Sequence, residues 1–127
     1  MSERLSWTFS VQAVGGPRIA TSKDLDVDAY DKIGVVVAAG ADETVELQPG
    51  PAGRVQFLLV ASTVYDDALT YKVNDPAGTA IKLDGQLLLL GDGAVGLLGA
   101  PPGKLIFHNG AADDATIQIL IGRKATS

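Results

Sequence analysis

His108 is the only histidine in the chain, and histidine is the side chain that most readily exchanges a proton near neutral pH. Asp113 and Asp114 follow it closely, and a carboxylate commonly orients a histidine that acts as a base or binds a metal. The chain has no cysteine, and no serine stands in a G-x-S-x-G turn, so no recognisable nucleophile accompanies such a base. We interpret His108 as an ordinary residue at a loop edge and retain it as a candidate ligand-binding residue.

Three alternating carboxylates, Asp24, Asp26 and Asp28, resemble the first half of a calcium-binding loop. An EF-hand requires glycine at the sixth position and glutamate at the twelfth, and this chain has Ala29 and Val35 there. In an extended strand the three carboxylates share one face, which could hold a hard cation. We favour a solvated polar strand face, keep these aspartates as candidate metal ligands, and expect no cofactor.

Two other patterns are better explained by turns than by chemistry. Acidic residues in predicted loops could form a glycosidase pair, but that mechanism requires a defined distance between carboxyl groups, which a sequence does not give. The glycines at 91, 93 and 96 spell G-x-G-x-x-G, yet we expect no strand–turn–helix unit around them to direct backbone amides at a phosphate. We therefore expect no enzymatic activity.

Tyr30 and Tyr65 are the aromatic residues that the sequence leaves available for a ligand. The chain has seven aromatic residues, and the other five fall on apolar faces of predicted strands. Exposed aromatic rings are common stacking platforms in sugar-binding domains. Tyr30 and Tyr65, together with His108, are thus the candidate ligand-binding residues.

The charge distribution argues against nucleic acid and anionic membranes as partners. The net charge is −5, and the ten basic residues are scattered along the chain, whereas phosphate binding needs clustered lysine and arginine. The longest apolar runs are too short to cross a bilayer as a helix, and the first residues do not resemble a signal peptide. The absence of cysteine suits a reducing compartment, and we expect a cytoplasmic location.

These residues must be positioned by strands, because the hydrophobic pattern has a period of two. Residues 5–13 alternate strictly between apolar and polar, which is typical of a half-buried strand, and no stretch sustains a period of 3.6. All six prolines fall in turn clusters, and Asn109-Gly110 predicts a hairpin between the last two strands. Strands are predicted in residues 5–13, 24–29, 33–39, 44–48, 54–62, 69–73, 81–83, 87–90, 94–98, 105–107 and 116–121.

About ten short strands at such spacings indicate a single all-β domain over residues 1–127. The predicted architecture is an antiparallel two-sheet β-sandwich, jelly-roll-like in its strand order. The nearly continuous apolar run at residues 33–39 is typical of a strand covered on both faces.

An apolar surplus predicts self-association. Hydrophobic residues make up 46% of the chain and charged residues only 20%, and several strands are apolar on both faces although a sandwich buries one face of each sheet. We expect a homo-oligomer, a trimer or a dimer. The predicted function is a non-catalytic structural protein that forms or decorates a larger particle. The alternative is a small-molecule or carbohydrate binding module.

Overall fold

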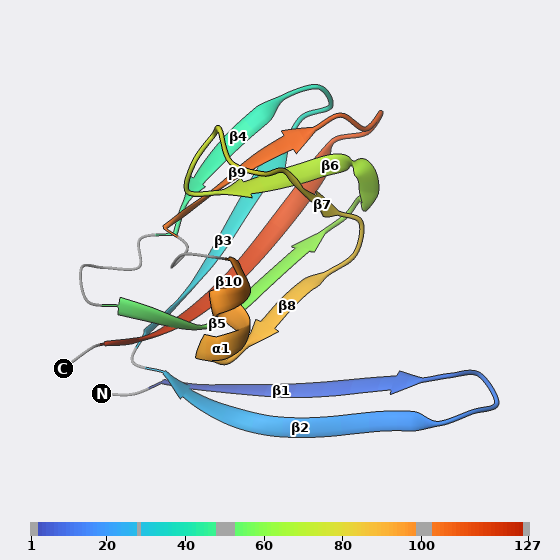
Figure 1. Cartoon of the computed structure of the whole chain (residues 1–127), viewed down its shortest axis with the longest axis vertical. Helices are drawn as coiled ribbons and strands as arrows, with labels where there is room; N and C mark the ends of the chain where they lie inside the picture. The colour runs from blue at the N-terminus through green and yellow to red at the C-terminus, as the bar shows by residue number, and fades with distance from the viewer. Residues whose placement is uncertain (1–2, 28, 48–52, 99–102, 126–127) are drawn as a thin grey trace.

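The described residues form ten antiparallel strands and one short helical segment, so the predicted all-β class is confirmed (Figure 1). The structure is a computed structural model and describes residues 3–27, 29–47, 53–98 and 103–125. The elements are β1 (Glu3–Gln12), β2 (Arg18–Val27), β3 (Ala29–Val37), β4 (Asp42–Glu46), β5 (Gly53–Ser62), β6 (Asp66–Val73), β7 (Ile81–Leu83), β8 (Leu87–Leu90), α1 (Asp92–Val95), the 3₁₀ turn η1 (Gly96–Leu98), β9 (Lys104–Asn109) and β10 (Ala115–Ala125).

Eight of the strands form a β-sandwich of two four-stranded sheets, in the orders β3-β10-β5-β8 and β4-β9-β6-β7. The pairing is nested: β3 pairs with β10, β4 with β9, β5 with β8, and β6 with β7. The inward side chains of both sheets make one apolar core between them. Its buried members are Val37, Val45, Leu47, Val55, Leu58, Val60, Leu69, Tyr71, Leu83, Val95, Leu105, Phe107, Ala115, Ile117, Ile119 and Ile121.

The remaining two strands, β1 and β2, form a separate two-stranded sheet that extends away from the sandwich, and we call it the arm (Figure 1). The alternation at residues 5–13 is confirmed as a strand, but residues 18–23, for which no strand was predicted, continue β2 back to the arm's tip. Gly15, with a φ of 73°, turns the chain at that tip, and Gly16 N donates to Ala13 O at 2.8 Å.

The hairpin predicted across Asn109-Gly110 is wrong, because β9 and β10 lie in different sheets. Asn109 is fully buried, and its side-chain amide donates to the backbone carbonyls of Val37 and Asp113, both at 2.9 Å. Its side-chain oxygen accepts from Ala111 N at 3.0 Å. These bonds hold a connection that crosses from one sheet to the other, whereas an Asn-Gly hairpin turn would have kept both strands in one sheet.

The strand predicted at residues 94–98 is also wrong, since these residues belong to α1 and η1. Gly91, with a φ of 94°, turns the chain out of β8, and Val95 N donates back to Gly91 O at 3.1 Å. This helical turn buries Val95 in the core and leaves Leu97 exposed. A strand–turn–helix unit is therefore present around the glycines, contrary to the sequence interpretation, but its helix has only four residues. Within the described residues, no helix is long and apolar enough to span a membrane.

Candidate functional site

His108 does not lie with the aspartates predicted to accompany it. It pairs across the sheet with Asp42 of β4, and its Nδ1 lies 2.5 Å from the Asp42 carboxylate. Asp114 instead accepts a hydrogen bond from Ala39 N at 2.9 Å, and the backbone carbonyl of Asp113 accepts from Asn109. Both members of the His108–Asp42 pair are more than half exposed to solvent. Solvent screens such a pair, and exposed ion pairs contribute little to stability.

Two of the candidate metal ligands, Asp24 and Asp26, lie on the polar face of the arm. Asp24 accepts a hydrogen bond from the Ser6 hydroxyl at 2.7 Å, and Asp26 forms an ion pair with Arg4 Nε at 3.1 Å. The hydrogen bond to Asp26 and its charge raise the pKa of Arg4 above its usual value. Asp28 lies outside the described residues. Within the described part of the chain, no group of three or more carboxylates or histidines is placed to hold a metal ion.

The two candidate tyrosines lie far apart. Tyr30 pairs with Gly122 at one end of β10. Tyr65 lies three residues beyond Ser62 of β5, and Ser62 pairs with Ile117 of β10. Five residues of strand separate these positions, about 17 Å at the usual rise. The hydroxyl of Tyr65 accepts from Ser62 N at 3.0 Å. The tyrosines therefore do not form a single stacking platform.

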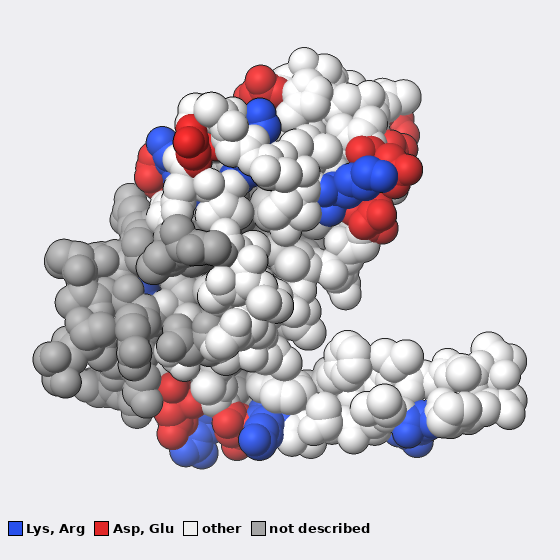
Figure 2. Space-filling view, in the orientation of Figure 1, with Lys and Arg blue, Asp and Glu red and all other residues white. Residues whose placement is uncertain are grey.

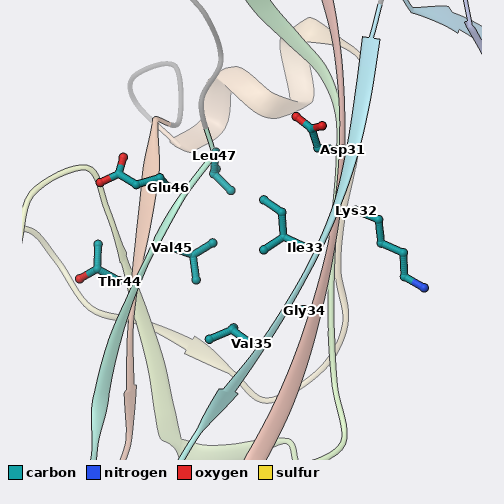
Figure 3. Close-up of a pocket in the computed structure, with 9 residues that line it drawn as sticks. All are labelled: Asp31, Lys32, Ile33, Gly34, Val35, Thr44, Val45, Glu46 and Leu47. Carbon is teal, nitrogen blue, oxygen red and sulfur yellow. The ribbon is translucent and has the colours of Figure 1, made fainter.

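A groove between the edge strands of the two sheets was missed by sequence reasoning (Figure 3). It encloses about 470 Å³, within the usual range for small-molecule sites, and runs between β3 and β4. Ile33 and Val35 of β3 point toward Val45 of β4 and Leu47, which follows β4, in Figure 3, while Lys32 points away. No sequence signal could have located this groove, because it depends on which strands end up at the sheet edges.

One face of the arm is largely apolar and faces solvent along its outer half. Antiparallel partners share a face, and the register pairs Leu5 with Leu25 and Val11 with Ile19. Between these pairs, Lys23 lies opposite Trp7 and Thr21 opposite Phe9, so the β1 side of the face is apolar and the β2 side is mixed. Toward the tip these side chains are open to solvent: Phe9 is 41% exposed, Val11 54% and Ile19 70%. In Figure 2 the arm extends away from the sandwich, and a wide gap separates the two in this view. Sequence reasoning identified the apolar face but predicted that it would be buried.

The root of the arm, in contrast, is seated on the sandwich. Val27 is buried, and a Cβ built on Gly122 would lie 2.8 Å from Leu5 Cδ1 and 3.2 Å from Val27 Cγ1. Gly122 and its neighbour Phe57 lie on the face of the β3-β10-β5-β8 sheet that is turned away from the core, which we call the outer face. The arm therefore begins as a cover for this face and then leaves it.

The rest of the outer face carries leucines that are only partly covered. Leu120, Leu59 and Leu88 are lateral neighbours in one row across β10, β5 and β8, and Leu90 is the neighbour of Phe57 in the next row. All four leucines are partly exposed. On the edge strand β3, Val36 is 56% exposed on the same face, so the prediction that residues 33–39 are covered on both faces is wrong for the single chain.

Comparison of the chain with known protein families and with curated proteins finds no match.

Proposed function

We propose that this protein is a non-catalytic structural protein that associates with itself as a dimer or trimer and forms or decorates a larger assembly. The observation that carries the proposal is the arm, a ribbon that leaves its own sandwich and has a largely apolar face, interrupted on β2 by Thr21 and Lys23. Solvent-exposed apolar surface of this extent usually marks a protein–protein contact. The arm supplies the excess apolar surface that the composition had suggested.

The candidate catalytic and metal-binding groups are consistent with this proposal. His108 and Asp42 lie on an exposed strand face, and Asp24 and Asp26 are engaged in cross-strand contacts. In Figure 2 most of the visible basic side chains lie beside acidic ones, and the basic atoms on the outer part of the arm stand alone, so this face shows no basic cluster that would favour nucleic acid or an anionic membrane as a partner. The nested strand pairing supports a jelly roll, a fold used in capsid and lectin domains. The proposed location is the cytoplasm.

Light scattering on a sizing column at micromolar concentration tests the proposal. We expect a mass of two or three times the 13.1 kDa of one chain. A single species of 13.1 kDa across the micromolar range would contradict self-association, and with it the structural function. Circular dichroism on the same sample establishes that the strand-rich fold is intact.

A second candidate function, binding of a small molecule or carbohydrate, is favoured by the groove between β3 and β4. A Val35→Trp variant fills this groove, and Val36→Trp is its matched control because Val36 points to the opposite face. If the groove binds a ligand, a panel of sugars and small apolar compounds raises the melting temperature of the native chain and of Val36→Trp only. If no compound raises the melting temperature of the native chain, or if a compound raises that of Val35→Trp by the same amount, the result argues against this function.

A further inference from the structure

We propose that the apolar face of the arm docks on the outer face of the β3-β10-β5-β8 sheet of a second copy of this chain. This inference rests on the proposed self-association and specifies the two surfaces that meet. The arm face is formed by residues of β1 and β2 around Trp7, Phe9, Val11 and Ile19. The receiving surface, the outer leucines, comprises Leu59, Leu88, Leu90 and Leu120.

A small part of this contact already exists within one chain, at the root of the arm. Leu5 and Val27, at the root of the arm, pack over Gly122 on the outer face, and the absence of a side chain at Gly122 permits this close approach. Trp7, Phe9 and Val11 continue the same face of the same strand, since residues two apart point the same way. The root therefore shows which face of the arm fits which face of the sheet.

The two surfaces also match in length. From Leu5 to Val11 the arm face spans six residues, and from Gly122 to Thr116 the outer face spans six residues of β10. Each distance is about 20 Å at the rise of an antiparallel strand, and Leu5 and Gly122 at the near ends are already in contact within one chain. Among the described residues only the root makes this contact, so the stretches from Trp7 to Val11 and from Leu120 to Thr116 are left for a second copy.

A hollow on the receiving face offers room for a ring of the arm. It encloses about 200 Å³ beside the outer leucines and is lined by Ala61, Ser62, Thr63, Thr116 and Gln118. The hollow has room for the ring of Phe9, although four of its five lining residues are polar. Its lining of small and polar side chains leaves open space rather than a filled surface.

The expected interface is small. An arm face about 20 Å long and about 10 Å wide, seated on a sheet, removes surface from both partners. Two seated arms bury on the order of 800 Å² in total, which is typical of a weak protein complex. Every copy offers one arm and one outer face, so a closed ring of two or three copies leaves neither surface unused.

Docking of arm against arm is the competing arrangement. It would cover the arm faces but leave the outer leucines of both copies partly exposed. Arm-on-sheet docking covers both apolar surfaces in one contact, which is why we favour it.

Paired aspartate substitutions on each surface test the proposal. Phe9→Asp and Ile19→Asp place a charge in the arm face, and Leu88→Asp and Leu120→Asp place one in the receiving face. We expect each variant to weaken self-association on the order of 100-fold, because a docked charge would be buried without a partner. The light-scattering mass then falls to 13.1 kDa at micromolar concentration.

Matched controls carry the same charge on surfaces that the proposal leaves free. Ser10→Asp and Ala20→Asp lie on the polar face of the arm, and Thr44→Asp lies on the other sheet of the sandwich. These variants are expected to keep the native oligomer. Circular dichroism and melting curves verify that every variant is folded before its mass is compared.

Cross-linking provides a readout that does not depend on these variants folding equally well. The natural chain has no cysteine, so Val11→Cys and Leu120→Cys chains, mixed and treated with a short bis-maleimide, can join only at the introduced thiols. We expect a covalent heterodimer, and none when Gln12→Cys replaces Val11→Cys. The sole tryptophan, Trp7, lies on the arm face, and its emission should shift to shorter wavelength as the chain associates.

The outcomes separate this inference from the proposed function. A native chain that stays monomeric overturns both. A native oligomer that the arm variants dissociate while Leu88→Asp and Leu120→Asp leave it intact overturns arm-on-sheet docking alone. Cross-linking of Val11→Cys chains to each other but not to Leu120→Cys chains does the same and supports arm-against-arm contact.

Discussion

The arm and the sandwich use the same sequence pattern with opposite results. In β1 the alternating apolar residues Phe9 and Val11 are about half exposed, whereas in β10 the alternating residues Ile117, Ile119 and Ile121 are fully buried. The two strands have nearly the same length and both are antiparallel. They differ in what lies opposite the apolar face: a second sheet for β10 and, among the described residues, no covering element for the outer half of β1.

This difference shows what a period of two does and does not determine. The alternation fixes which side chains share a face, because successive residues of a strand point in opposite directions. It does not fix whether another element covers that face. In a single chain, an apolar face without cover is a surface for a partner, and we infer that the arm has this role.

Truncation of one phenylalanine in each region sharpens the contrast and should give the largest effect. Phe107 is fully buried beside Tyr71, so Phe107→Ala should lower the free energy of unfolding by about 3–5 kcal/mol. Phe9→Ala should change the stability of the dissociated chain by less than about 0.5 kcal/mol. Urea denaturation at low protein concentration measures both values.

At high protein concentration the same pair should behave differently. There Phe9→Ala should also lower the apparent stability, because the association that stabilises the folded chain is weakened. Equal losses for both variants at low concentration would mean that the arm is covered within one chain, and the contrast between the regions would disappear.

The connections of the two regions offer the next comparison. The arm turns at Gly15 through local backbone geometry, whereas the β9–β10 connection depends on the buried side chain of Asn109. Asn109→Leu should lower the free energy of unfolding by about 2–3 kcal/mol, since it leaves the carbonyls of Val37 and Asp113 without their donor. Thermal and urea unfolding measure the loss, with the exposed Gln86→Leu as control. Unchanged stability would show that water replaces these bonds.

The boundary between the regions lies at Gly122. A valine there would collide with Leu5 and Val27, so Gly122→Val should displace the arm root and cost about 1–2 kcal/mol of stability. Trp7 fluorescence should report the displacement. The control is Gly34→Val on the same outer face, where an added Cβ meets nothing within 4 Å. If both variants leave the emission of Trp7 unchanged, the root is not seated as described.

The smallest effect is expected at His108. Its side chain and that of Asp42 are both largely exposed on the sandwich, so His108→Ala should change the free energy of unfolding by less than about 0.5 kcal/mol. Self-association should also be unchanged, because this residue lies on neither docking surface. A drop in oligomer mass in this variant would show that the interface involves the β4-β9-β6-β7 sheet, contrary to the proposed docking.

The sequence by itself determined most of the strands and many of the turns, but not the helical turn at residues 92–98 or the first half of β2. Strict alternation at residues 5–13 and the glycine–proline clusters act locally, through side-chain direction and allowed backbone angles, so they can be read without a fold. The apolar surplus likewise predicted that part of the apolar surface is buried by self-association.

Only the tertiary structure decided which strands share a sheet, and with that the candidate sites. Asp42 became the partner of His108, and Ile33 came to face Val45 across a groove, because β4 joined β9 and β3 became a sheet edge. The helical turn at Val95 and the crossing at Asn109 depend on contacts with residues far away in the chain. Whether an apolar face is buried or free is decided by those distant contacts, and no local pattern of residues contains them.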